Sequence, residues 1–141
     1  LYLLATGTGL APFLSIVKDP DVYQRFESVR LVHCVRKIED LAYFDYLSKE
    51  LSNNEFLGEG ATKKFEYMPT VTREEFRLRG RITDLITNKT LDLNAKDDRV
   101  MLCGSQSMLK DVSHLLDSKG FSVSAGQGSP GDYVFERAFA E

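Results

Sequence analysis

The sequence predicts an α/β protein with a doubly wound, mostly parallel sheet of five to six strands. Two observations predict this fold. Short apolar runs alternate with segments whose apolar residues recur at helical spacing, and the first apolar run ends in the turn Thr6-Gly7-Thr8-Gly9. Ligands of such sheets bind at the carboxyl ends of the strands, beside the point where the strand order reverses. We therefore expect the functional residues in the turns after the first and fourth strands.

The first half of the chain supplies three of the strands. Residues 1–5 are a short, fully apolar run, which is typical of a buried parallel strand. Four apolar residues at helical spacing predict a helix over 10–18, and Pro12 lies near its start, where a missing N–H costs nothing. The other elements expected here are one helical turn over 22–26 after a break at 19–21, a strand over 29–35, an amphipathic helix over 38–51, a loop over 53–61 and a strand over 64–71.

The second half completes the alternation of strands and helices. A charged connection over 72–80 leads to a short helix over 82–88, and residues 100–103 form a fourth apolar strand. Residues 105–119 form a helix, and Gly120 ends it in the position where left-handed backbone is common. Residues 121–123 are a candidate fifth strand and residues 133–135 a sixth, separated by a glycine-rich loop over 126–131.

Composition limits the class of protein. The chain has 141 residues, about one domain, and its net charge of −3 lacks the basic excess of nucleic-acid-binding modules. Its apolar runs are far shorter than the ~20 residues that span a bilayer, and two cysteines form no disulfide framework. We expect a cytoplasmic, monomeric domain that binds neither nucleic acid nor membrane.

The N-terminus adds one further expectation. The chain opens directly on Leu1-Tyr2-Leu3-Leu4-Ala5, with neither a methionine nor a basic segment before it. This start is typical of the first strand of a sheet that begins within a longer protein. We therefore expect residues 1–141 to be a fragment that holds one domain of a longer protein, with an N-terminal partner domain outside it.

The glycine turn and two strand ends indicate nucleotide binding. Glycines at the start of a helix let the backbone approach a phosphate, although Pro12 replaces the third glycine of the dinucleotide pattern and a plain strand-to-helix turn is the alternative. Arg36 and Lys37 end the second strand, where proteins that bind NAD carry an acid. If Arg73 and Arg81 converge on the same edge, the three guanidinium groups favour NADP; otherwise this is an exposed basic strand end.

The remaining candidates are weaker. Cys103 ends the fourth strand, either as a core residue or beside a nicotinamide ring, whereas Cys34 is assigned to the core. His33 and His114 are isolated, so we predict no metal site. The sequence also shows no Ser–His–Asp order with a nucleophile elbow.

Taken together, these segments resemble the C-terminal, NADP-binding domain of bacterial ferredoxin (or flavodoxin)–NADP+ reductases, which has a Rossmann-like sheet. The resemblance covers the whole chain. It is carried by Ala5-Thr6-Gly7-Thr8-Gly9-Leu10-Ala11-Pro12-Phe13, Val32-His33-Cys34-Val35-Arg36, Thr72-Arg73-Glu74, Gly80-Arg81-Ile82-Thr83, Met101-Leu102-Cys103-Gly104-Ser105 and Val134-Phe135-Glu136-Arg137-Ala138-Phe139.

The resemblance implies hydride exchange between NADP(H) and FAD, followed by single-electron transfer with ferredoxin or flavodoxin. It implies that Cys103 is catalytic beside the nicotinamide, and that Arg36, Arg73 and Arg81 hold the 2′-phosphate. The other implied cofactor contacts are Thr6, Gly7, Thr8, Gly9, Leu10, Ala11, Pro12, Gly104, Ser105, Met108, Ala138 and Phe139, with the last two near the flavin. The family's FAD-binding barrel and its Arg-x-Tyr-Ser type signature precede this domain, and that signature is absent here. We therefore expect the isolated domain to be inactive.

Two alternatives stay open from the sequence. Instead of serving ferredoxin or flavodoxin, the chain could be part of an oxygenase reductase, which is the first alternative. The second alternative is a non-catalytic module that senses NADP or ADP. The absence of a cysteine cluster disfavours the first for this segment. A tail that reaches a flavin disfavours the second.

Overall fold

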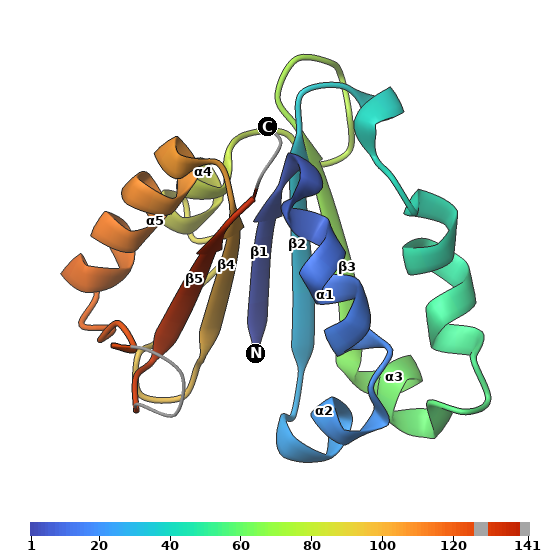
Figure 1. The fold of residues 1–141 in the computed structure, drawn as a ribbon. Coiled ribbons are helices and arrows are strands. Elements are labelled where there is room, and N and C mark those ends of the chain that lie inside the picture. The colour runs from blue at the N-terminus through green and yellow to red at the C-terminus, as the bar shows by residue number, and fades with distance from the viewer. Residues whose placement is uncertain (126–129, 139–141) are drawn as a thin grey trace.

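A single parallel sheet organises the chain (Figure 1). The computed structural model describes residues 1–125 and 130–138. Within these residues five strands, all parallel, lie in the order β3-β2-β1-β4-β5. The strands are β1 (Tyr2–Thr6), β2 (Val29–Val35), β3 (Phe65–Val71), β4 (Val100–Gly104) and β5 (Tyr133–Arg137). The predicted doubly wound α/β fold is therefore confirmed.

The strand order reverses beside β1. The chain runs outward from β1 through β2 to β3, and it then returns to place β4 on the other side of β1. Leu3 of β1 pairs with Leu31 of β2 on one side and with Met101 of β4 on the other. The switch point consequently lies between the carboxyl ends of β1 and β4, where open α/β sheets bind their ligands.

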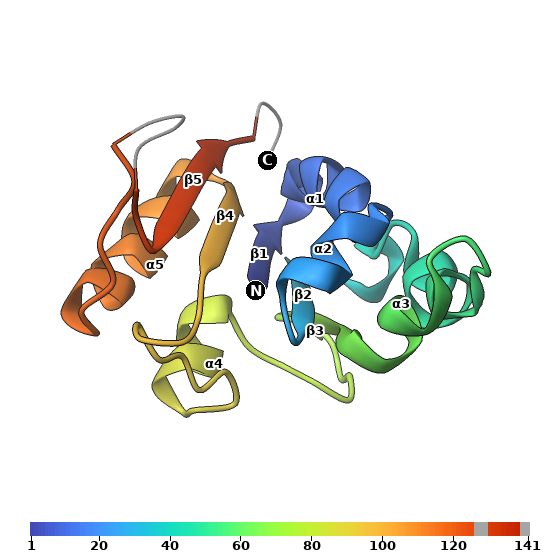
Figure 2. The ribbon, with the colours of Figure 1, turned by 90° about the horizontal axis from the view of Figure 1, so that it is seen from below.

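Helices cover both faces of the sheet, because successive strand residues point to opposite sides. On one face α4 (Ile82–Thr87) and α5 (Gln106–Ser118) pack on alternate strand residues such as Leu4, Val32 and Leu102. On the other face α1 (Leu10–Val17), α2 (Pro20–Arg25) and α3 (Gly58–Lys64) pack on Leu3 and Leu31. Figure 2 shows the two helical layers on either side of the strands.

Both ends of α5 are capped, and Gly120 ends the helix as the sequence predicts. The Ser105 hydroxyl accepts a hydrogen bond from the Met108 amide at 3.2 Å, which satisfies a free donor of the first turn. At the other end Gly120 has a φ of +89°. The amides of Gly120 and Phe121 donate to the carbonyls of Asp117 and Leu116, which is the Schellman arrangement.

Three predicted elements are wrong. Residues 38–51 are not one helix: a 3-10 turn, η2 (Ile38–Asp40), is separated by Tyr43, whose φ is +63°, from a π-helical segment, η3 (Tyr46–Glu50), and a 3-10 turn, η4 (Leu51–Asn53). The loop predicted over 53–61 contains the start of α3, which Ala61 anchors in the core. Residues 121–123 form no strand, since only Val123 makes an isolated bridge, to Tyr133.

Candidate functional site

The turns after β1 and β4 lie against each other at the switch point. The Ser105 amide donates to the Thr6 hydroxyl at 3.2 Å, which links residues 99 positions apart in the chain. A methyl group on Gly9 would collide with the Cys103 carbonyl, and one on Gly104 would collide with the Thr6 hydroxyl. Glycine is therefore required at position 9 by backbone contact, and at position 104 it leaves room for the Thr6 side chain. The two turns pack directly against each other.

The turn after β1 is a 3-10 turn, η1 (Gly7–Gly9), which leads directly into α1. Gly7 and Thr8 are exposed, as are Ala11 and Pro12 on the first turn of α1. Gly9 and Leu10 are buried instead, and Leu10 packs in the core beneath α1. Open backbone at the start of a helix is the arrangement that binds phosphate groups in proteins, so the structure places the predicted turn where an anion can reach it.

His33 lies beneath this turn. Its side chain is 1% exposed, and Nε2 is 2.9 Å from the carbonyl oxygen of Gly7. Burial lowers the pKa of His33 below its ordinary value, and the hydrogen bond to Gly7 opposes this in smaller part. Sequence reasoning treated His33 as isolated and missed this contact. The available signal was a polar residue at an inward-facing position of a strand that is otherwise largely apolar.

Three arginines gather at the ends of β2 and β3. The Arg73 amide donates to the Arg36 carbonyl at 2.9 Å, and the Gly80 amide donates to the Val71 carbonyl at 3.3 Å, so the connection folds back and returns Arg81 to this edge. All three arginine side chains are exposed. Within the described residues none of them pairs with a carboxylate. The cluster is a set of cations available to an anion.

Short contacts hold the connection that carries these arginines. The Thr70 hydroxyl donates to the Gly80 carbonyl at 2.7 Å, and the Cys34 thiol lies 3.8 Å from the same oxygen. Phe76 packs on a small core of Val35, Leu41 and Val71. Cys34 is buried, as expected, and it helps to fix the backbone immediately before Arg81.

Cys103 is buried at the end of β4, with 2% of its surface exposed. Burial, and in smaller part the Glu136 carboxylate, raises the pKa of the Cys103 thiol. A raised pKa favours the neutral thiol over the thiolate, which is the nucleophilic form. Gly104 is buried, Ser105 is half-buried, and Met108 packs in the core under α5.

The end of β5 returns to the same edge. The Ala138 amide donates to the Gly104 carbonyl at 3.0 Å, and Ala138 is buried. Glu136 pairs in register with Cys103 on β4. Ala138 is thereby joined to the turn after β4, whereas Phe139 lies outside the described residues.

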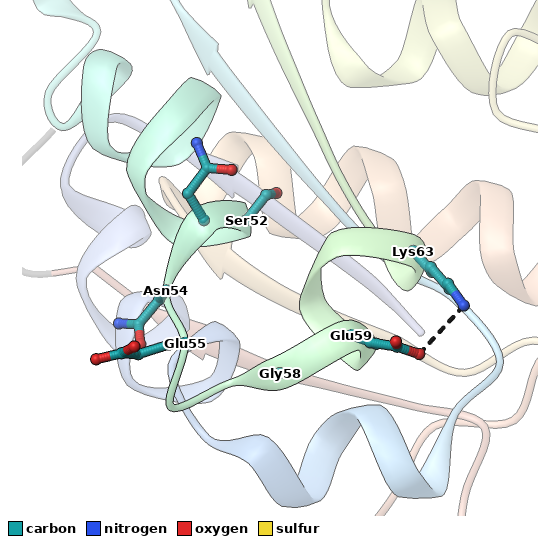
Figure 3. A pocket seen from close by; sticks show the side chains of 7 residues that line it. Ser52, Asn54, Glu55, Gly58, Glu59 and Lys63 are labelled. Carbon is teal, nitrogen blue, oxygen red and sulfur yellow. Dashed lines mark hydrogen bonds and ion pairs between the residues drawn. The ribbon is translucent and has the colours of Figure 1, made fainter.

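A surface hollow away from this edge has a different character. It lies between η4 and α3, and its lining includes Asn54, Glu59 and Lys63. Figure 3 shows Glu59 and Lys63 directed toward each other in an ion pair of 3.2 Å. The hollow contains none of the predicted site residues. In the described part of the chain no group of three metal-ligating side chains occurs, and no helix is long and apolar enough to cross a membrane.

Comparison with known proteins shows what the chain is similar to. The family described as the oxidoreductase NAD-binding domain matches residues 3–114. The chain is 50% identical to the ferredoxin–NADP reductase of Pseudomonas aeruginosa, over 100% of this chain and 57% of that protein. It is 52% identical to the ferredoxin–NADP reductase A of Sorangium cellulosum, over 99% of this chain and 52% of that protein. The chain thus spans about half the length of the curated relatives it matches.

A solved structure shows the same fold. A ferredoxin NADP+ reductase from Neisseria gonorrhoeae, with bound FAD and NADP, superposes with a TM-score of 0.83 at 32% sequence identity. The superposition covers 98% of this chain and 55% of that one.

Proposed function

Because the chain belongs to the oxidoreductase NAD-binding domain family, we propose that it is the NADP(H)-binding part of a ferredoxin (flavodoxin)–NADP+ reductase. The observation that carries the proposal is the arginine cluster of Arg36, Arg73 and Arg81, which lies at the carboxyl ends of β2 and β3, on one side of the open turn at Gly7–Gly9. The 2′-phosphate distinguishes NADP from NAD, and guanidinium groups are its usual partners. Relatives named for NADP support the same assignment.

The described residues fit the nucleotide in a definite order. The 2′-phosphate would lie on the arginines, and the pyrophosphate on the exposed backbone of Gly7 and the first turn of α1. The nicotinamide would lie over Cys103, at the edge where Thr6, Gly104, Ser105 and Ala138 meet. NADP(H) supplies the hydride, and the protein supplies orientation.

The neutral Cys103 thiol would shape the nicotinamide position without reacting itself. Cys103 is buried, and Gly9 packs against the Cys103 carbonyl. These two residues would therefore set how closely a planar ring could approach the end of β4. Met108 would contribute through its backbone bond to Ser105, because its side chain is in the core.

FAD, in this proposal, is held mainly by residues outside this chain, in a domain that the relatives' additional length would supply. Ala138 and Phe139 would approach the flavin. Ferredoxin or flavodoxin is the proposed electron partner. Two free, buried cysteines support a reducing compartment such as the cytoplasm.

Paired titrations with 2′,5′-ADP and 5′-AMP test the nucleotide assignment. The wild-type chain should prefer 2′,5′-ADP, because only this ligand carries the 2′-phosphate. Arg36→Ala should weaken 2′,5′-ADP by about 10- to 150-fold, the equivalent of one charged hydrogen bond, and leave 5′-AMP nearly unchanged.

Arg25→Ala is the matched control. Arg25 ends α2, is exposed, and lies before the amino end of β2, away from the arginine cluster. It should leave both affinities as in the wild type. Equal affinity of the wild-type chain for the two ligands would contradict NADP specificity and leave only a nucleotide-binding fold.

A further inference from the structure

We propose that His33 is a positioning residue that keeps the carbonyl group of Gly7 turned inward, away from the phosphates of the bound nucleotide. This inference rests on the proposed function, because it concerns the same turn. It goes further by assigning the orientation of one peptide plane to one buried side chain.

The strand register places His33 directly beside the turn. His33 on β2 pairs with Ala5 on β1, two residues before Gly7, and its ring lies on the face of the sheet that α1 covers. The side chain is 1% exposed, so the ring is held by packing on all sides. From this position Nε2 lies 2.9 Å from the Gly7 carbonyl oxygen.

The chemistry of this contact fixes the state of the ring. A carbonyl oxygen only accepts hydrogen bonds, so Nε2 carries the hydrogen and donates it to Gly7. In the neutral ring Nδ1 is then a bare acceptor, and it is buried without a hydrogen-bond partner among the described residues. Burying an unpartnered polar atom is unfavourable, so an apolar residue would suit packing alone. The hydrogen bond to Gly7 is the interaction that the imidazole adds.

Gly7 is the residue whose peptide needs such an anchor. Its φ is +52°, and no atom of the described part of the chain lies within 4 Å of the position of a Cβ. A glycine, which lacks a Cβ, has few steric limits on φ or ψ, so sterics at Gly7 alone do not fix the direction of its carbonyl. Turned outward, that oxygen would present negative partial charge to the pyrophosphate. His33 holds it toward the interior of the molecule.

A matched pair of variants separates the effect of the hydrogen-bond donor at position 33 from the effect of the side-chain volume. His33→Gln keeps an N–H near the position of Nε2, whereas His33→Met has a similar length and no donor. The ligands are NADP+, which contains the pyrophosphate, and 2′-AMP, which lacks it but still presents the 2′-phosphate to the arginines. His33→Met should weaken NADP+ about tenfold or more, the equivalent of one lost hydrogen bond and its consequences, and leave 2′-AMP within about twofold. His33→Gln should restore most of the NADP+ affinity.

Other outcomes are equally decisive. Unchanged NADP+ affinity in His33→Met overturns the proposal, and so does an equal loss of NADP+ and 2′-AMP, which would indicate a general effect on the fold. If the wild-type chain binds neither ligand, the proposed function fails instead, and the state of the ring still decides the His33 contact.

Nitrogen NMR of the imidazole reads that state without mutating His33. His114 is the second histidine of the chain and is exposed on α5, so His114→Gln leaves a single imidazole to observe. At neutral pH the spectrum should show hydrogen on Nε2 and none on Nδ1. Hydrogen on Nδ1, or averaging between both nitrogens, would exclude the bond to Gly7.

Discussion

At the scale of single residues, the buried imidazole of His33 predicts a dependence of stability on pH. Burial lowers its pKa in the folded state below 6.5, so below about pH 6.5 the unfolded chain binds the extra proton more readily than the folded one. The free energy of unfolding should therefore fall on acidification through this range, by up to about 1.4 kcal/mol per pH unit for one group. Urea unfolding at several pH values should show a smaller fall for His33→Gln.

A His33→Gln curve parallel to the wild type would show that the ring protonates alike in both states. Sequence reasoning could place Arg36 and Arg73 just after the carboxyl ends of β2 and β3, because parallel strands end at one edge of the sheet; that they bind a phosphate stays a prediction. It missed the role of His33, because that depends on the direction of a glycine carbonyl.

At the scale of elements, close contact between the turn after β1 and the end of β4 predicts which of three Gly→Ala variants is the least stable. Gly9→Ala should lower the free energy of unfolding by about 3 kcal/mol, the upper end of the usual range for overpacking, since its methyl meets the Cys103 and Gly104 backbone. Gly7→Ala and Gly58→Ala both place alanine at positive φ in open space, at about 1–2 kcal/mol each. Chemical unfolding ranks the three variants, and a Gly9→Ala effect no larger than the Gly58→Ala effect would contradict the contact.

The elements themselves were predictable where both faces are buried. The strands could be predicted because β1 and β2 are apolar almost throughout. The helix expected over 38–51 fails for a tertiary reason: the Glu74 carboxylate accepts from the Ile38 amide at 2.7 Å, and Leu41 packs between Val35 and Val71. These contacts draw the segment over the strand ends, and no local periodicity reports them.

At the scale of the whole molecule, the chain spans about half the length of its curated relatives, and the flavin site is proposed to lie largely outside it. The chain alone, with FAD and ferricyanide added, should bind NADPH without oxidising it. Absorbance of NADPH over time measures this, with the Pseudomonas aeruginosa relative as positive control. Sustained oxidation dependent on the chain would place a working flavin site within these residues.

The hydrogen bond from Ser105 to Thr6 has a consequence for the order in which the molecule assembles. It joins residues 99 positions apart, so the loop that it closes includes most of the chain, and contacts of such high sequence separation slow folding. During synthesis β1 emerges before the other four strands and can pair with β2, which in turn pairs with β3, while the other edge of β1 waits for β4. The nucleotide-facing edge is thus among the last parts to close, and the exposed edge of β1 is the place where chaperone or neighbouring chain would first engage the nascent protein.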